Sequence, residues 1–224
     1  MRNTRKKELS RRSFIKTGTT AATVFSIVPG HVVGANGKTP PSEKLNIAGI
    51  GIGGMGRGNI GACKGENVVA LCDVDSAYAG KTFKAHPNAA TYVDYRVMLE
   101  KQKDIGAVVI ATPDHTHAVI TMAAIEMGKH VYCQKPLTHT VEEARKITAA
   151  ARASKVQTQM GNQGHSSDAI RVVREWVQSG SIGDVKEVHA WTDRPDDGPW
   201  YANFGARDLP SDFPAVPDSL NWDL

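Results

Sequence analysis

The residues whose spacing suggests chemistry lie between positions 51 and 73. Gly51, Gly53 and Gly56 form the pattern G-x-G-x-x-G, and an acid, Asp73, stands 22 positions after the first glycine. In a dinucleotide site the first glycine permits a sharp exit from a strand, the second lets the backbone approach a pyrophosphate, and the third lets a helix pack closely on the strand. Asp73 is predicted to accept hydrogen bonds from both ribose hydroxyls and to repel a 2′-phosphate, which favours NAD over NADP. A glycine-rich turn without a ligand is the alternative.

A second group of polar residues directly follows the apolar run 106–111. It comprises Thr112, Pro113, Asp114, His115 and His117. Ligands of doubly wound sheets bind outside the carboxyl ends of the strands. Pro113 is expected to fix the turn, and the acid and the two histidines could then reach a nicotinamide ribose. A capped helix start with solvated histidines explains the same residues.

A third group, Gln134-Lys135-Pro136, follows the apolar run 129–133. A lysine at the end of a buried strand, held by a proline, can present its ammonium group to a sugar or ribose hydroxyl. We therefore interpret Lys135 as a candidate catalytic residue. The alternative is a surface lysine in a turn.

The elements that must position these residues alternate between short apolar runs and helical periods. This order predicts βαβ units and a Rossmann-type, doubly wound parallel α/β sheet. Thr140 is the expected cap of one of the helices. The predicted strands cover 45–50, 68–72, 90–93, 106–111, 129–133 and 156–160, and the predicted helices cover 77–85, 95–101, 116–127, 142–153 and 166–179.

The first 35 residues are predicted to be a twin-arginine signal peptide and no part of the fold. Residues 10–16, SRRSFIK, match the export pattern, which the twin-arginine machinery reads as an address. The apolar stretch 17–28 is too short to span a bilayer, and Val33-Gly34-Ala35 resembles a cleavage site. Residues 36–43 form a polar linker. We expect a periplasmic or otherwise exported protein, with a disordered basic tail as the alternative.

Charge and cysteine content narrow the classes of partner. The chain carries a net charge of +4, but residues 1–35 carry +6, which leaves −2 for the remainder. Nothing in the body of the chain therefore indicates nucleic-acid binding. Cys63, Cys72 and Cys133 form no C-x-x-C pair, so we expect free thiols and no metal site.

Several motifs together resemble the Gfo/Idh/MocA oxidoreductase family. They are the strand-glycine unit from Lys44, ALCDVD at 70–75, VVIATPDHTHAVI at 108–120, GKHVYCQKPL at 128–137 and TQMGNQGH at 158–165. Their joint occurrence and order make the resemblance specific. The chain is most similar to exported bacterial members, which include glucose-fructose-oxidoreductase-like proteins and NAD-dependent glycoside hydrolases.

The resemblance implies roles for individual residues. Asp73 and the glycine turn, which includes Gly54, Met55 and Arg57, would contact the adenosine half of NAD. The loop from Thr112 to His117 would contact the nicotinamide half, and Asn162 matches a position that touches the cofactor. The family's usual Glu-Lys-Pro is Gln134-Lys135-Pro136 here, so the role of the lysine transfers and that of the glutamate does not.

The resemblance also implies a domain order: a nucleotide-binding domain over 44–163 and the start of an α+β open-sheet substrate domain over 164–224. Residues 185–192 alternate like an edge strand of that sheet. The family's Asp-x-x-x-His pair would lie beyond residue 224, so we expect a C-terminally truncated member.

Three functions stay open. The first is hydride transfer between a sugar-like alcohol and a tightly bound nicotinamide cofactor, in a protein expected to be a homo-oligomer at full length. The second is glycoside cleavage by transient oxidation and elimination. The third is a nucleotide-binding fragment without turnover.

Overall fold

The structure is a computed structural model that describes residues 39–40, 43–191 and 215–224. The predicted signal peptide, its cleavage site, most of the linker and much of the proline-rich stretch after Arg194 lie outside these residues. The chain divides into a unit of residues 1–43 and a unit of residues 44–224. The fold described below belongs to the second unit.

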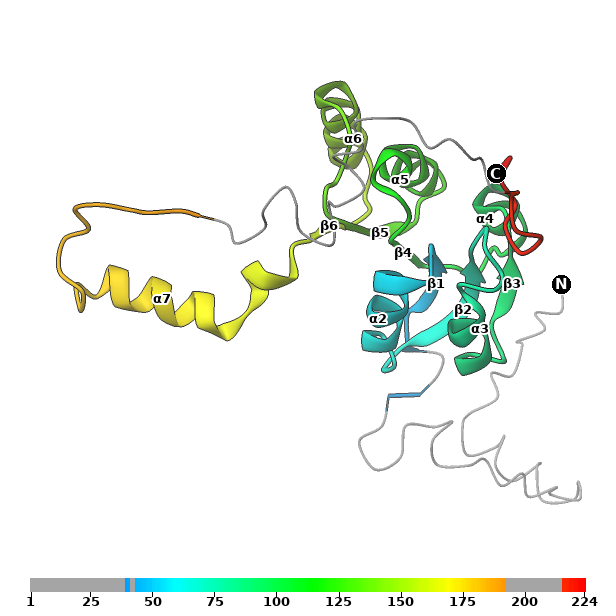
Figure 1. The fold of residues 1–224 in the computed structure, drawn as a ribbon, viewed down its shortest axis with the longest axis horizontal. Helices are drawn as coiled ribbons and strands as arrows, with labels where there is room; N and C mark the ends of the chain where they lie inside the picture. Colours follow the sequence, from blue (N-terminus) through cyan, green and yellow to red (C-terminus); the bar gives the residue numbers. More distant parts are fainter. Residues whose placement is uncertain (1–38, 41–42, 192–214) are drawn as a thin grey trace, which may run out of the picture. The chain divides into compact units, whose positions relative to one another are not determined.

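A six-stranded sheet forms the centre of this unit (Figure 1), and every pair of neighbouring strands in it is parallel. The order is β3-β2-β1-β4-β5-β6, which is the Rossmann order. The predicted fold class is therefore confirmed for the nucleotide-binding part. The strands are β1 Asn46–Ile50, β2 Asn67–Cys72, β3 Ala90–Tyr92, β4 Ala107–Ile110, β5 His130–Gln134 and β6 Thr158–Gly161.

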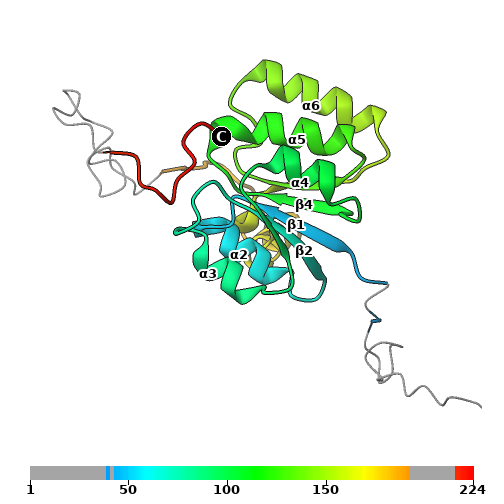
Figure 2. The same cartoon turned by 90° about the vertical axis from the view of Figure 1, so that its right-hand side faces the viewer.

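Helices cover both faces of the sheet. Figure 2 shows α4, α5 and α6 over one face and α2 and α3 over the other. Each face has its own buried core, built around Met98, Ile110 and Ile125 on the first and around Ile52, Ile60 and Leu71 on the second. The helices are α2 Gly54–Ala62, α3 Gly80–Ala85, α4 Tyr95–Lys101, α5 His117–Glu126, α6 Val141–Ala153 and α7 Asp168–Gln178, with 3₁₀ turns η4 Asp114–Thr116 and η5 Gln163–Ser166.

The expected cap of α6 is confirmed. The Thr140 hydroxyl accepts a hydrogen bond from the Glu143 amide at 3.2 Å, and the Glu143 carboxylate accepts one from the Thr140 amide at 2.8 Å. Such a reciprocal capping box satisfies backbone N–H groups that have no partner inside the helix.

Two of the predicted elements differ in the structure. The helix expected from residue 77 begins only at Gly80, because the Asp75 carboxylate accepts hydrogen bonds from the Ala77 and Tyr78 amides and holds a turn there. The strand expected over 185–192 is wrong for its described part, since residues 185–191 are exposed and irregular. An alternating sequence makes a strand only beside a partner, and the described residues offer none there.

Helix α7 is confirmed, but none of its residues is buried. Its large apolar side chains are exposed: Ile170, Val172, Val173, Trp176 and Val177. The assignment of residues 164–224 to a separate substrate domain stays a prediction.

The cysteines are free thiols, as predicted. Cys72 and Cys133 are buried, and burial is the main cause that raises the pKa of Cys72 to about 12. Within the described part of the chain no cluster of side chains could hold a metal ion, and no helix is both long and apolar enough to cross a bilayer.

Candidate functional site

The glycine turn joins β1 to α2 and leaves no room for side chains at two of its positions. Gly51 has φ +73°, and a Cβ on it would lie 2.7 Å from the Thr112 amide nitrogen. A Cβ on Gly56 would collide with the Gly51 carbonyl oxygen. The sharp exit predicted for Gly51 and the close helix packing predicted for Gly56 are both confirmed.

The first turn of α2 follows the glycine turn at the carboxyl end of β1. Its N-cap residue, Gly53, is extended and supplies no side-chain cap. Met55 and Arg57 lie in the first turn and are exposed. Unpaired N–H groups and the helix dipole favour negative charge at such an end, so the turn has the chemistry that a pyrophosphate needs.

Asp73 ends β2 and holds the glycine turn directly. One carboxylate oxygen accepts hydrogen bonds from the amides of Ile52 at 2.8 Å and Gly53 at 3.1 Å. The other accepts one from the Asp75 amide at 3.0 Å. A carboxylate offers about four acceptor positions, so about one remains for a ribose hydroxyl. Contact with both hydroxyls, as predicted, requires one of the three amides to give way.

Tyr78 is a residue that sequence reasoning missed. A Cβ on Gly53 would coincide with the Tyr78 ring, and one on Gly54 would lie 2.5 Å from its hydroxyl. The ring therefore occupies the space beside Gly53 that was reserved for a pyrophosphate. Tyr78 is 64% exposed, so no buried core holds the ring there. The only signal in the sequence is an aromatic residue five positions after Asp73, and this signal is too general to predict the contact.

The loop after β4 separates its predicted residues into two groups. Pro113, Asp114 and His115 are exposed at the carboxyl end of the strand. His117 is buried, with 1% of its surface exposed. The loop is tied internally, because the Thr116 hydroxyl donates to the Pro113 carbonyl at 2.8 Å.

His117 connects two strand-end loops. Its Nδ1 lies 2.6 Å from the Pro136 carbonyl oxygen and its Nε2 lies 2.8 Å from the Thr112 carbonyl oxygen. Carbonyl oxygens only accept, so both nitrogens donate and the ring is an imidazolium. The pKa of His117 is raised to about 9, first by the side chain of Cys133 and then by these carbonyls, against the opposing effect of burial.

This geometry corrects the direct contact predicted between His117 and the nicotinamide ribose. Both nitrogens are already engaged with the backbone, so neither is free for a ligand. His117 instead links the loop containing Lys135 to the loop containing Thr112.

The loop after β5 presents Lys135 and buries Gln134. Lys135 is exposed, and its peptide bond to Pro136 is cis. The Gln134 side-chain oxygen accepts hydrogen bonds from the Lys135 amide and from the Gln163 side chain, both at 3.0 Å. Both bonds use an acceptor oxygen, which a glutamate would also provide, so glutamine preserves this bonding without the negative charge. Asn162 follows β6 and is exposed.

The sheet order places these loops along one edge. The chain leaves β1 toward β2 and β3 on one side and returns to β4, β5 and β6 on the other, so β1 and β4 flank the switch point. Ligands of such sheets bind in the crevice outside the carboxyl ends of these strands. Gly51 touches the loop of Thr112, and His117 joins this loop to that of Lys135. Asp73, at the end of β2, bonds to the amides of the glycine turn from the other side of β1.

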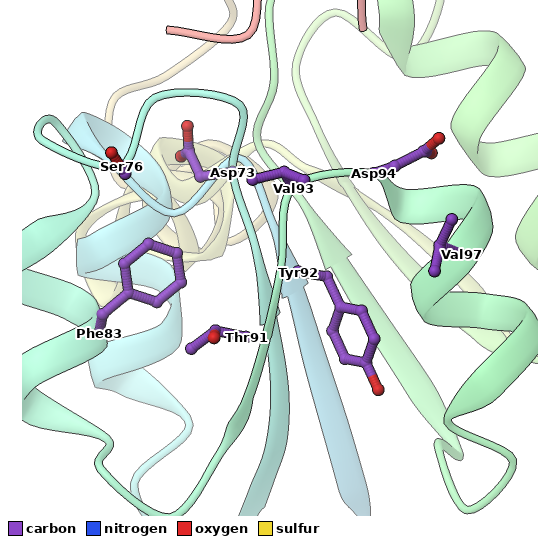
Figure 3. Close-up of a pocket in the computed structure, with 8 residues that line it drawn as sticks. All are labelled: Asp73, Ser76, Phe83, Thr91, Tyr92, Val93, Asp94 and Val97. Carbon is purple, nitrogen blue, oxygen red and sulfur yellow. The ribbon is translucent and has the colours of Figure 1, made fainter. Parts of the chain in front are cut away.

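A pocket of about 520 Å³ lies beside this edge, and its lining includes residues of the edge strand β3 and of the segments on either side of it (Figure 3). Phe83 and Thr91 lie on one side of β3, and Tyr92 and Val97 lie on the other. Its remaining lining residues are Asp73, Ser76, Val93 and Asp94. The pocket lies at the β2–β3 side of the sheet, and Asp73 belongs both to its lining and to the hydrogen bonds that hold the glycine turn.

Comparison with known proteins gives consistent matches. Residues 45–162 match the Gfo/Idh/MocA family, described as an oxidoreductase family with an NAD-binding Rossmann fold. Inositol 2-dehydrogenase of Serratia proteamaculans is 31% identical over 162 residues, which cover 70% of this chain and 48% of that enzyme. Levoglucosan dehydrogenase of Pseudarthrobacter phenanthrenivorans is 34% identical over 92 residues, which cover 41% of this chain and 23% of that enzyme.

A solved structure agrees in fold. The scyllo-inositol dehydrogenase from Lactobacillus casei with bound cofactor NAD(H) and scyllo-inositol matches with a TM-score of 0.58 at 25% identity. The match covers 63% of this chain and 43% of that one. The chain thus spans about half the length of the inositol 2-dehydrogenase that it matches.

Proposed function

The chain belongs to the Gfo/Idh/MocA oxidoreductase family, and from that premise we propose that it binds NAD at the crevice between β1 and β4. The whole protein would move a hydride between this cofactor and a sugar or sugar-like alcohol. The observation that carries the proposal is the link through His117, which joins the loop of Lys135 to the loop of Thr112 beside the glycine turn.

The residues present fit the cofactor. The uncapped start of α2 and the tight turn at Gly51 suit a pyrophosphate, and Asp73 keeps about one acceptor position for a ribose hydroxyl. The exposed ring of Tyr78 must turn aside for phosphates to reach Gly53. When bound, NAD supplies the acceptor for a hydride. Lys135 would orient the substrate hydroxyl, and the proton of that hydroxyl would pass to a base outside the residues described.

Two observations favour one cofactor and one type of reaction. The negative charge of Asp73 at the end of β2 favours an unmodified ribose over a 2′-phosphate, and hence NAD over NADP. The relatives named above are dehydrogenases of inositols and of levoglucosan. This favours net oxidation or reduction of a polyol over glycoside cleavage, and it favours turnover over binding alone.

Titration tests the binding step on this chain, and turnover tests the role of Lys135. We expect wild type to bind NAD more tightly than NADP. In the full-length protein, Lys135→Ala should reduce kcat by far more than it changes the Kd for NAD. Lys129→Ala is the matched control, because this lysine caps the Lys103 and Ile105 carbonyls at the opposite end of β5. Failure to bind either nucleotide would refute the proposed function, and normal turnover of Lys135→Ala would remove Lys135 from the site.

We also propose that residues 1–35 direct export by the twin-arginine machinery. Twin-arginine transport carries folded proteins, and NAD is made in the cytoplasm, so the protein would fold around NAD and retain it. Retained cofactor must be reduced and reoxidised within one cycle. Bound ligand also stabilises the fold, by about 4 kcal/mol at a thousandfold excess over Kd.

Cell fractionation and nucleotide release test this export proposal. Replacing Arg11 and Arg12 with lysine should leave a cofactor-loaded protein in the cytoplasm. Denaturing the exported wild type should release close to one nucleotide per chain. An exported protein that carries almost no nucleotide and works only with added NAD would contradict cofactor retention.

A further inference from the structure

The last described residues of the chain lie against the turn that follows β2. Leu220 forms an antiparallel bridge with Asp75. The Ser76 amide donates to the Ser219 carbonyl at 3.0 Å, and the Asn221 amide donates to the Val74 carbonyl at 2.9 Å. We call residues Ser219–Asn221 the strap.

Side chains reinforce these backbone bonds. The Ser76 hydroxyl donates to the Ser219 carbonyl at 3.3 Å, and the Asn221 side-chain amide donates to the Val74 carbonyl, also at 3.3 Å. Hydrogen bonds from the Tyr78 and Ala77 amides and from the Ser219 side chain hold the pKa of Asp75 below its usual value. The strap is thus bonded to every residue of the turn from Val74 to Ser76.

This turn makes hydrogen bonds to two residues of the candidate cofactor site, Asp73 and Tyr78. The Asp75 amide donates to the Asp73 carboxylate, which in turn holds the amides of the glycine turn. The Asp75 carboxylate accepts from the Tyr78 amide and so fixes the start of the segment that places the Tyr78 ring on Gly53. A chain of direct contacts therefore runs from the strap through Asp75 to both Asp73 and Tyr78.

We propose that the strap is a positioning element of the nucleotide site, which orders Asp73 for the adenosine half of the cofactor. This inference rests on the proposed function, and it assigns to residues 219–221 a role at the end of the site far from the chemistry. Binding and strap docking are then coupled. Because such coupling is reciprocal, a ligand of the adenosine half must also tighten the strap.

Two halves of the dinucleotide serve as separate probes. AMP tests the adenosine end, and nicotinamide mononucleotide tests the other end. Asn221→Pro removes both the backbone N–H and the side-chain amide that donate to the Val74 carbonyl, and Asp218→Ala, at the exposed position just before the strap, is the control. We expect Asn221→Pro to raise the Kd for AMP about twofold to tenfold, with an unchanged Kd for nicotinamide mononucleotide.

A second variant and a second measurement keep the test decisive. Ser76→Ala removes only the hydroxyl that bonds the strap, so it decides the matter if Asn221→Pro unfolds. In wild type, AMP should slow hydrogen exchange at the Ser76 and Asn221 amides. An unchanged Kd for AMP in the folded variants, or an equal loss of affinity for both probes, would overturn the proposed role of the strap but not the proposed binding of NAD. Wild type that binds neither NAD nor AMP would overturn the proposed function and the strap together.

Discussion

The imidazolium of His117 makes the stability of the fold depend on pH in a defined direction. The buried ring donates to the carbonyls of Pro136 and Thr112, and the side chain of Cys133 first and these carbonyls next raise its pKa to about 9 from the ordinary 6.5. Since the folded-state value lies above the unfolded one, the stabilisation is complete below pH 6.5. It is lost as the pH rises through 9, because deprotonation leaves one nitrogen facing a carbonyl without a proton.

The size of the effect follows from the two pKa values. Between 6.5 and about 9 the difference corresponds to about 3 kcal/mol of unfolding free energy, taken as an upper value. Loss of this magnitude is a large fraction of the stability of an ordinary domain. It would also release the loop of Lys135 from the loop of Thr112, so nucleotide binding should weaken over the same pH range.

Denaturant unfolding at about pH 6 and about pH 10 measures this loss. Cysteines and tyrosines also titrate near the upper pH, so the informative quantity is the difference between wild type and His117→Gln, which keeps a donor and cannot titrate. Wild type should lose about 3 kcal/mol more than the variant. Nitrogen-15 NMR at neutral pH should show both ring nitrogens of His117 protonated. A neutral ring with one bare nitrogen would refute the reasoning, as would equal losses in the two proteins.

Three further substitutions test other parts of the site and its frame. Gly56→Ala places a Cβ against the Gly51 carbonyl and should lower the free energy of unfolding by about 1–3 kcal/mol, whereas Gly58→Ala in the same helix meets nothing within 4 Å and should be neutral or stabilising. Asp73→Asn keeps an acceptor oxygen but removes the charge, so titrations should show a smaller preference for NAD over NADP than in wild type. Thr140→Ala removes the capping box of α6 and should cost about 1 kcal/mol in thermal or denaturant unfolding.

Features of the site that depend on local spacing were predictable from the sequence. The interval between Gly51 and Gly56 specifies a strand, a turn and a helix in contact, and the collision of a Cβ on Gly56 with the Gly51 carbonyl shows why glycine is required. The interval between Thr140 and Glu143 specifies a capping box in the same way. Continuous apolar runs such as 107–110 identified the buried strands, because strands covered on both faces do not alternate.

Features that depend on distant contacts were not predictable. Nothing near His117 in the sequence indicates that its ring would meet the Pro136 carbonyl, 19 residues away. The bond between Asn221 and Val74 spans 147 positions, so no local pattern could reveal the strap. The alternating residues 185–191 failed as a strand for the related reason that a strand exists only through pairing with another.

The polar side chains of the site divide according to what they bind. Asp73, His117 and Gln134 are buried and direct their polar atoms to the protein itself, chiefly to backbone groups of the loops around the crevice. They hold the loops in place before any ligand arrives, and this reduces the ordering cost of binding. The groups left for a dinucleotide are the uncapped amides at the start of α2, the remaining acceptor position of Asp73 and exposed side chains such as Lys135. Substitution of Asp73, His117 or Gln134 should therefore change the affinity for every ligand that contacts the loop held by that residue. Substitution of Lys135 should change only the reaction of the substrate that Lys135 touches.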